Sequence, residues 1–141
     1  LLLPSPLSIS PRDIFTSSPS RPHSTPTKLS QRRCLNILIV EDDPVCQRLI
    51  ARYLARLPLA TACTVVPNGA EAIEAVKSYA HRRFDLILMD ISMPVMDGVR
   101  AAAAIREVDA AVPIISMTGR AGQEDVERYL SAGMNDVLEK P

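Results

Sequence analysis

Tryptophan is absent from this 141-residue chain, aromatic residues make up only 4% of it, and there are only three cysteines. Cys34, Cys46 and Cys63 are widely spaced, and neither a CxxC pair nor a nearby pair of histidines accompanies them. Such an odd, scattered set argues against a disulfide framework and against a zinc motif. It predicts reduced cysteines that act as small apolar side chains in a cytosolic or nuclear protein.

Long hydrophobic runs are also missing. No apolar run approaches the roughly 20 residues that a membrane-spanning helix needs, and residues 1–3, which Pro4 interrupts, are too short for the core of a signal peptide. No glycine-rich phosphate loop occurs, which argues against nucleotide binding. The sequence has no initiator methionine, so we expect a fragment or a processed product.

Positive and negative charges balance over the whole chain but not along it. The 16 basic and 16 acidic residues give a formal net charge of zero. Residues 1–33 hold five basic residues against one acid, a net charge of +4, whereas residues 34–141 hold the other eleven against fifteen, a net charge of −4. A mildly acidic globular part suits the binding of cations better than a nucleic-acid surface.

Proline divides the chain into two parts. Residues 1–33 contain six of the twelve prolines among many serines and threonines. Such a segment buries too little apolar surface to offset the entropy of ordering it, so we predict a disordered, basic Ser/Thr/Pro-rich linker. With 47% apolar residues, the chain can bury one core but hardly two, and we place that single domain at residues 34–141.

Short apolar runs alternate with segments of helical periodicity in that domain. Strands are expected at residues 35–40, 61–66, 84–89, 113–117 and 135–139, and helices at 45–57, 70–80, 99–107 and 124–131. Strands that alternate with helices predict an α/β fold, in which helices cover both faces of a parallel sheet.

Four of the predicted strands end in polar residues, namely Glu41 with Asp42, Asp90, Thr118 and Lys140. Because the carboxyl ends of parallel strands share one edge of a sheet, these side chains are expected to converge. Clustered carboxylates repel one another, and a divalent cation such as Mg²⁺, which prefers oxygen ligands, relieves that repulsion. A lysine and a hydroxyl beside them suit an anion, so the chemistry indicated is phosphoryl transfer onto a carboxylate.

Each of these residues has a plainer interpretation when it is considered alone. Asp90 could simply end a strand, Thr118 could be a turn residue, and Lys140 could be a solvated surface lysine. Acids at 41–43 could form the first turn of a helix, where the helix dipole favours them. Their joint order at strand ends is what favours a shared site.

Four motifs closely resemble the receiver domain of two-component response regulators: ILIVEDDP at 37–44, LMDISMPVMDG at 88–98, IISMTG at 114–119 and GMNDVLEKP at 133–141. The resemblance covers about residues 35–141. It implies a flavodoxin-like, doubly wound parallel sheet of five strands in the order 2-1-3-4-5. The motifs are most similar to fungal regulators that join a heat-shock-factor-type DNA-binding domain to a receiver, and to the receivers of fungal hybrid histidine kinases.

The resemblance also implies a set of ligands around one acceptor. Asp90 would be the phospho-acceptor. Glu41 and Asp42 would be the acidic pair that holds Mg²⁺, with Asp90 and the main-chain carbonyl of Ser92 as further ligands.

Roles for the remaining strand ends follow from the same resemblance. Lys140 would pair with the phosphoryl oxygens, the Thr118 hydroxyl would reorient towards them, and the Lys140–Pro141 peptide bond would be cis. Ser92 and Arg120 would influence the water that hydrolyses the acyl phosphate, and no enzymatic turnover beyond this weak self-dephosphorylation is expected.

Partners and location are implied as well. The phosphoryl donor would be a phosphohistidine on a histidine kinase or a histidine phosphotransfer protein. The output would be an attached or partner effector, expected to be a transcription factor that reaches DNA through a domain outside this sequence. We therefore expect an intracellular protein, cytoplasmic or nuclear, with no membrane segment.

Two departures from the family pattern matter. Val137 stands in the last strand where many receivers have Tyr or Phe, so an aromatic switch coupled to Thr118 is not expected. The sequence stops at Pro141, where the family's fifth helix would follow. The face beside the helix at 45–57 is then expected to expose an apolar patch on the order of several hundred Å². This truncated receiver should be less stable than a full domain and tend to associate.

Two other classes of function use the same residues. A small metal-dependent phosphatase would need a positioned general acid and a substrate pocket, and neither is evident in the sequence. A pseudo-receiver would fold without being phosphorylated and act only as an interaction module. All five site positions hold residues competent for phosphorylation, which argues against a pseudo-receiver.

Overall fold

A central parallel sheet organises the computed structural model, which describes residues 33–59, 61–79 and 83–140. The strands are β1 (Leu35–Val40), β2 (Thr61–Val66), β3 (Leu86–Asp90), β4 (Ile114–Thr118) and β5 (Asp136–Glu139). The helices are α1 (Pro44–Leu54), α2 (Gly69–Ser78), α3 (Gly98–Val108) and α4 (Gln123–Ser131). The strand order β2-β1-β3-β4-β5 confirms the predicted doubly wound fold.

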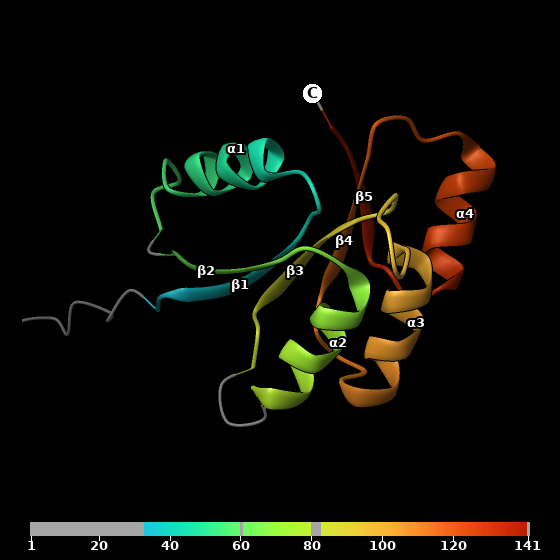
Figure 1. Ribbon diagram of the computed structural model, residues 1–141, viewed down its shortest axis with the longest axis horizontal. Helices are drawn as coiled ribbons and strands as arrows, with labels where there is room; N and C mark the ends of the chain where they lie inside the picture. Colours follow the sequence, from blue (N-terminus) through green and yellow to red (C-terminus); the bar gives the residue numbers. More distant parts are fainter. Residues whose placement is uncertain (1–32, 60, 80–82, 141) are drawn as a thin grey trace, which may run out of the picture. The chain divides into compact units, whose positions relative to one another are not determined.

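The two faces of the sheet are covered unequally (Figure 1). Side chains of α2, α3 and α4 pack with the larger buried cluster on one face, and α1 packs with a smaller cluster on the other. Side chains along β1 point alternately to the two faces of the sheet, so this strand contributes to both clusters. Leu38 and Val40 belong to the larger cluster, and Ile37 and Ile39 belong to the smaller one.

Helix starts follow the capping pattern of the sequence. Asp43 caps α1 by accepting a hydrogen bond from the Val45 N–H at 2.7 Å, and Pro44 occupies the first helical turn. Asp97 caps α3 in the same way, accepting from the Arg100 N–H at 2.9 Å. These caps fix where the loops that follow β1 and β3 end.

The end of α1 corrects one prediction. The helix stops at Leu54 rather than at residue 57, and a turn fills the gap before Pro58. Ile50 and Leu54 pack against the sheet, whereas Val45 and Tyr53 stay exposed. The prediction placed the end of the helix too late because Leu57, which lies in the turn, continues the apolar spacing of the helix.

An apolar groove of about 290 Å³ lies beside α1, on a face where α1 is the only helix among the described residues. It is lined by Cys46, Leu49, Ile50, Tyr53, Leu54, Leu88, Met117, Leu138, Glu139 and Lys140. The lower stability and the association predicted from this exposure remain predictions.

No helix among the described residues is long and apolar enough to cross a membrane.

Two predictions fall on residues that the structure does not describe. One is the linker at residues 1–33, of which only Arg33 is described, and the other is the cis peptide bond between Lys140 and Pro141. Both stay predictions.

Candidate functional site

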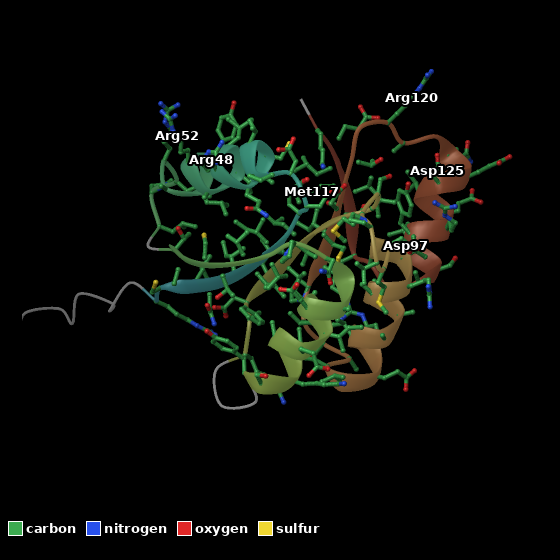
Figure 2. All side chains as sticks on the ribbon, viewed as in Figure 1. Arg48, Arg52, Asp97, Met117, Arg120 and Asp125 are labelled. Carbon is green, nitrogen blue, oxygen red and sulfur yellow. The ribbon has the colours of Figure 1, made fainter. Side chains whose placement is uncertain are left out.

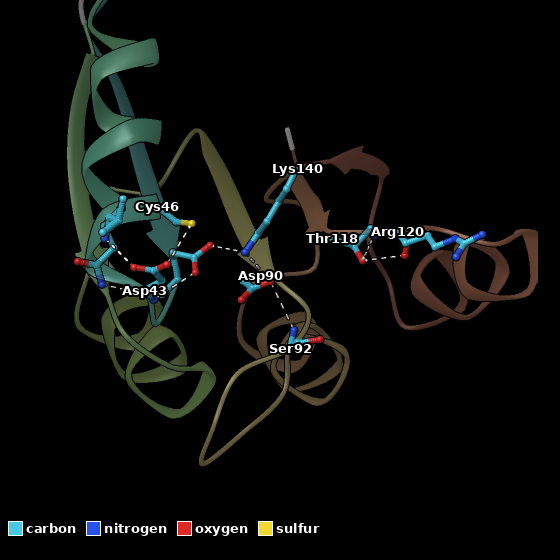
Figure 3. Close-up of polar contacts among 10 residues, drawn as sticks. Asp43, Cys46, Asp90, Ser92, Thr118, Arg120 and Lys140 are labelled. Carbon is cyan, nitrogen blue, oxygen red and sulfur yellow. Dashed lines mark hydrogen bonds and ion pairs between the residues drawn. The ribbon is translucent and has the colours of Figure 1, made fainter.

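The carboxyl edge of the sheet brings the predicted site residues together. Asp90 is the last residue of β3, Glu41 and Asp42 follow β1 directly, and Lys140 follows β5 directly. One oxygen from each of the three acids lies within 4.8 Å of the others. Figure 3 shows the Lys140 amine reaching down to the same group.

Burial differs among the three acids. Glu41 is 1% exposed and Asp90 is 4% exposed, whereas Asp42 is open to solvent. Oxygen donors with one open side, where water can complete the coordination, are the environment that Mg²⁺ prefers. The donor set of Glu41, Asp42 and Asp90 therefore fits a magnesium ion.

Lys140 supplies the positive charge of the cluster. Its Nζ lies 2.6 Å from Glu41 Oε2 and 3.1 Å from Asp90 Oδ1. Burial alone would lower the pKa of Lys140, but its hydrogen bonds to Glu41 and Asp90 and their negative charges raise that pKa overall. The ammonium thus stays protonated and partly neutralises two buried carboxylates.

Glu41 is an acid of the cluster whose charged form is disfavoured by burial. Burial raises the pKa of Glu41 above its ordinary value, and hydrogen bonds from Lys140 and from the Asp43 N–H offset part of the increase. The Asp43 N–H lies 3.2 Å from Glu41 Oε1. Each oxygen of this carboxylate therefore has a partner.

Thr118, at the end of β4, belongs to the same edge but its hydroxyl bonds within its own loop. Its Oγ1 donates to the Arg120 carbonyl at 3.0 Å (Figure 3). The Arg120 side chain points outward from the ribbon (Figure 2) and away from Asp90 and Lys140 (Figure 3). Both roles predicted for these two residues would require a movement from this conformation.

Ser92 follows Asp90 in the loop between β3 and α3. Its N–H donates to Asp90 Oδ1 at 3.4 Å, so Oδ1 receives both this contact and that of Lys140. The Ser92 carbonyl stays a predicted metal ligand.

Gly98 explains how α3 can start so close to the acceptor. A Cβ at Gly98 would lie 2.2 Å from the Asp90 carbonyl oxygen, a distance that no side chain tolerates. The Gly98 N–H also donates to the Ile91 carbonyl at 3.0 Å. The absence of a side chain therefore lets the first turn of α3 hold the end of β3.

Val95 gives the same loop a strained turn. Its φ is 67°, and the Met96 N–H donates to the Pro94 carbonyl at 2.8 Å. A three-residue turn with a positive central φ is strained, above all for a β-branched residue. The strained residue therefore lies in the loop that connects Asp90 to α3.

One supporting residue was missed in the sequence. The Gln47 amide Nε2 donates to the Glu41 main-chain carbonyl at 2.7 Å and so ties α1 to the acidic turn. The only available signal was a polar residue at helical spacing from the apolar Ile50 and Leu54. That signal does not identify a partner six residues away.

Comparison with known proteins agrees with this geometry. The family model described as response regulator receiver domain matches residues 37–141. The transcription factor SKN7 of Chaetomium thermophilum is 48% identical over 105 residues, which are 74% of this chain and 13% of that protein. Hybrid signal transduction histidine kinase B of Dictyostelium discoideum is 39% identical over 118 residues, 74% of this chain and 6% of that protein. The chain thus spans a small part of these relatives.

A solved structure gives the same result. The receiver domain of the sensor histidine kinase PA1611 of Pseudomonas aeruginosa, crystallised with a magnesium ion coordinated in its active site cleft, is 41% identical to this chain. The TM-score is 0.67, over 77% of this chain and 87% of that one. With the strand order and the acids at the sheet edge, these matches show that the chain belongs to the response regulator receiver domain family.

Proposed function

We propose that this receiver accepts a phosphoryl group from a phosphohistidine onto Asp90 and that the phosphorylated form switches an effector. The observation that carries the proposal is the Asp90 carboxylate, buried at the end of β3 beside two further acids and 3.1 Å from the Lys140 amine. A buried carboxylate among fixed charges is suited to phosphoryl transfer, where positioning and neutralisation supply most of the catalysis.

Asp90 acts as the nucleophile. Lys140 and the Ser92 N–H both contact Oδ1, so we assign the attack to Oδ2. In the transfer, the bond between phosphorus and the donor imidazole nitrogen breaks as the bond between phosphorus and Oδ2 forms. The imidazole leaves with the electron pair of the broken bond and takes up a proton.

The acids would hold the metal and the basic residue would hold the phosphoryl group. Glu41, Asp42, Asp90 and the Ser92 carbonyl are the proposed ligands of Mg²⁺, which when bound neutralises charge on the phosphoryl oxygens. Lys140 stays beside Asp90 and pairs with one of these oxygens. The Thr118 hydroxyl leaves the Arg120 carbonyl to bond another.

The donor would be a histidine kinase or a histidine phosphotransfer protein. The likeness to SKN7 favours a transcription factor as the effector, with DNA bound by a domain outside this sequence and the protein in the nucleus. The likeness to hybrid histidine kinases supports the alternative of a kinase receiver in the cytoplasm. We expect no turnover of external phosphomonoesters.

Replacement of the acceptor tests this function. Asp90→Asn is expected to abolish Mg²⁺-dependent labelling by a phosphorylated phosphotransfer protein or by acetyl phosphate, measured as hydroxylamine-sensitive phosphoryl incorporation by intact mass. Asp136→Asn, which changes an exposed acid on β5, is the matched control and should be labelled like the parent protein. Labelling that survives in Asp90→Asn would place the acceptor elsewhere. A parent protein that is never labelled would indicate a pseudo-receiver.

A further inference from the structure

Asp42 is the least supported acid of the cluster. Glu41 and Asp90 are buried at strand ends, whereas Asp42 is exposed. Within the described part of the chain, no group donates a hydrogen bond to the Asp42 carboxylate. One of its oxygens nevertheless lies within 4.8 Å of oxygens of the other two acids. The place of this carboxylate in the cluster therefore depends on the main chain that carries it.

Hydrogen bonds fix the main chain on both sides of Asp42. The Glu41 N–H donates to the Val66 carbonyl at 3.1 Å, and Asp43 is the N-cap of α1. The peptide unit between Glu41 and Asp42 has a side chain as its partner. Gln47 Nε2 donates to the Glu41 carbonyl at 2.7 Å. Gln47 thus holds the part of the turn that neither the sheet nor the helix cap holds.

This one hydrogen bond restricts the acid that follows it. A peptide unit is planar, so the direction of its carbonyl also fixes where the next Cα stands. The bond from Gln47 to the Glu41 carbonyl therefore sets the position of the Asp42 Cα and limits the movement of its carboxylate. The Gln47 N–H donates to the Asp43 carbonyl at 2.9 Å, so the glutamine itself is anchored in the first turn of α1.

Magnesium and calcium differ in what they require of such a ligand. Mg²⁺ demands near-ideal octahedral geometry with oxygens at about 2.0–2.1 Å, whereas Ca²⁺ accepts more oxygens at about 2.3–2.6 Å in flexible arrangements. A carboxylate that is free to shift by a few tenths of an ångström therefore weakens the binding of magnesium more than that of calcium.

We propose that Gln47 is a positioning residue that holds the Glu41–Asp42 peptide in the orientation that a small divalent cation requires, and so gives the site its preference for Mg²⁺ over Ca²⁺. The inference deepens the proposed function and rests on it only for the assignment of Asp42 as a metal ligand. Gln47 acts through the main chain and is not a ligand itself.

Ion affinities of a glutamine variant test this role. Gln47→Met keeps the length of the side chain but removes the donor. Its Kd for Mg²⁺, measured by isothermal titration calorimetry, should rise about tenfold, the lower range for loss of a group that orients a metal ligand. Its Kd for Ca²⁺ should rise less than about threefold. A general loss of stability would weaken both ions alike, so an unchanged ratio of the two constants overturns the proposal.

Gln123→Met is the matched control. Gln123 lies on α4, where its exposed amide donates to Glu127 at 3.4 Å. The same change of residue type, made away from the acidic turn, should leave both constants within about twofold of the parent. If Gln123→Met shifted the ratio as far as Gln47→Met, the effect would not come from the Glu41 carbonyl, and the proposal would fall.

A second measurement needs no variant. If the Gln47 hydrogen bond strengthens magnesium binding, magnesium must strengthen that hydrogen bond by the same factor. Exchange of the Gln47 side-chain amide protons with water, followed by NMR, should slow by about twofold or more when Mg²⁺ is added, while exchange at Gln123 stays constant. Exchange at Gln47 that is unchanged or faster overturns the proposal.

The two proposals fail in different ways. If Asp90 is never phosphorylated but Gln47→Met loses the preference for magnesium, the positioning role stands and the signalling role falls. If Asp90 is phosphorylated and Gln47→Met keeps the selectivity of the parent, the positioning role falls and the signalling role stands.

Discussion

At the carboxyl edge of the sheet three carboxylate oxygens crowd within 4.8 Å and Val95 takes a positive φ of 67°, whereas at the amino edge one arginine satisfies several polar groups at once. The Arg106 guanidinium donates to the carbonyls of Gly133, Asp109 and Val112 and to the Asn135 side chain, over 2.7 to 3.2 Å. The first edge concentrates negative charge and backbone strain, whereas the second provides polar groups with hydrogen-bond donors.

This difference fits the division of labour in an α/β sheet, where ligands bind at the carboxyl ends of strands. Strain and clustered like charges persist only where the surrounding structure imposes them, and they gather at functional sites. Arg106 ties α3 to the segments that lead into β4 and β5, so the amino edge supplies stability that the carboxyl edge gives up. Substitutions at the two edges should therefore separate stability from function.

The largest effect is expected from Gly98→Ala at the carboxyl edge. The new Cβ would collide with the Asp90 carbonyl, so β3 and α3 must separate, at a cost of about 3 kcal/mol in the free energy of unfolding. Urea unfolding measures the loss, and phosphoryl incorporation at Asp90 should fall with it. Gly119→Ala is the matched control, because nothing lies within 4 Å of its added Cβ. An equal loss in both variants would show that the edge as a whole, rather than this contact, is sensitive.

Arg106→Met at the amino edge is expected to cost somewhat less. The substitution keeps the aliphatic stem but leaves the partly buried carbonyls of Gly133 and Val112 without their donor, which should lower the free energy of unfolding by about 2 kcal/mol. The affinity for magnesium should not change, because no site residue contacts the guanidinium.

Arg100→Met, on the exposed side of the same helix, is the control and should change stability by less than about 0.5 kcal/mol. The comparison of the two edges would fail if Arg106→Met altered magnesium affinity as strongly as it altered stability.

A pH series isolates the lysine at the carboxyl edge. Although burial alone would lower the pKa of Lys140, its carboxylate partners raise it overall, so the folded protein holds this proton more tightly than the unfolded chain. The stabilisation is then complete below the ordinary lysine pKa of 10.5 and is lost as pH rises through the higher pKa of the folded state.

Thermal melts of the metal-free parent and of Lys140→Met should differ by a constant amount up to about pH 10 and converge above it. Lys77→Met gives the baseline for an exposed lysine. A difference that persists unchanged at the alkaline end would mean that Lys140 stabilises the fold through the packing of its stem rather than through its charge.

Much of this architecture is readable from local sequence. The buried runs of β1 and β3, the caps at Asp43 and Asp97, and the placement of Asp90 at a strand end follow from short-range patterns. The contact between Lys140 and Glu41 joins residues 99 positions apart, and no local pattern encodes which of three acids the lysine selects. Long-range pairing of polar groups is what the sequence leaves open.

The Arg106 network shows the same limit at the other edge. Its partners come from the end of α3, the approach to β4 and the residues after α4, and a helical arginine reads in sequence as a solvated residue. Gly133 follows the C-cap of α4 with a φ of 96°, the left-handed conformation that commonly ends a helix and that glycine adopts readily. The sequence does not reveal a second constraint on Gly133. A Cβ at this residue would lie only 2.7 Å from the Cγ of Arg106.

The smallest effect is expected at Val95, where strain can be removed without touching a ligand. Val95→Gly removes the cost of the positive φ, which is about 1–2 kcal/mol for a residue with a Cβ. Glycine also makes the unfolded chain more flexible, which lowers the stability of the fold by about 0.5–1 kcal/mol. The side chain is 80% exposed, so little packing is lost, and a net gain of about 0.5 kcal/mol in the free energy of unfolding should appear in urea titrations. Val95→Ala shortens the side chain but keeps its Cβ, and it should gain less. If alanine gained as much as glycine, the turn would not be strained, and the contrast between the two edges would rest on charge alone.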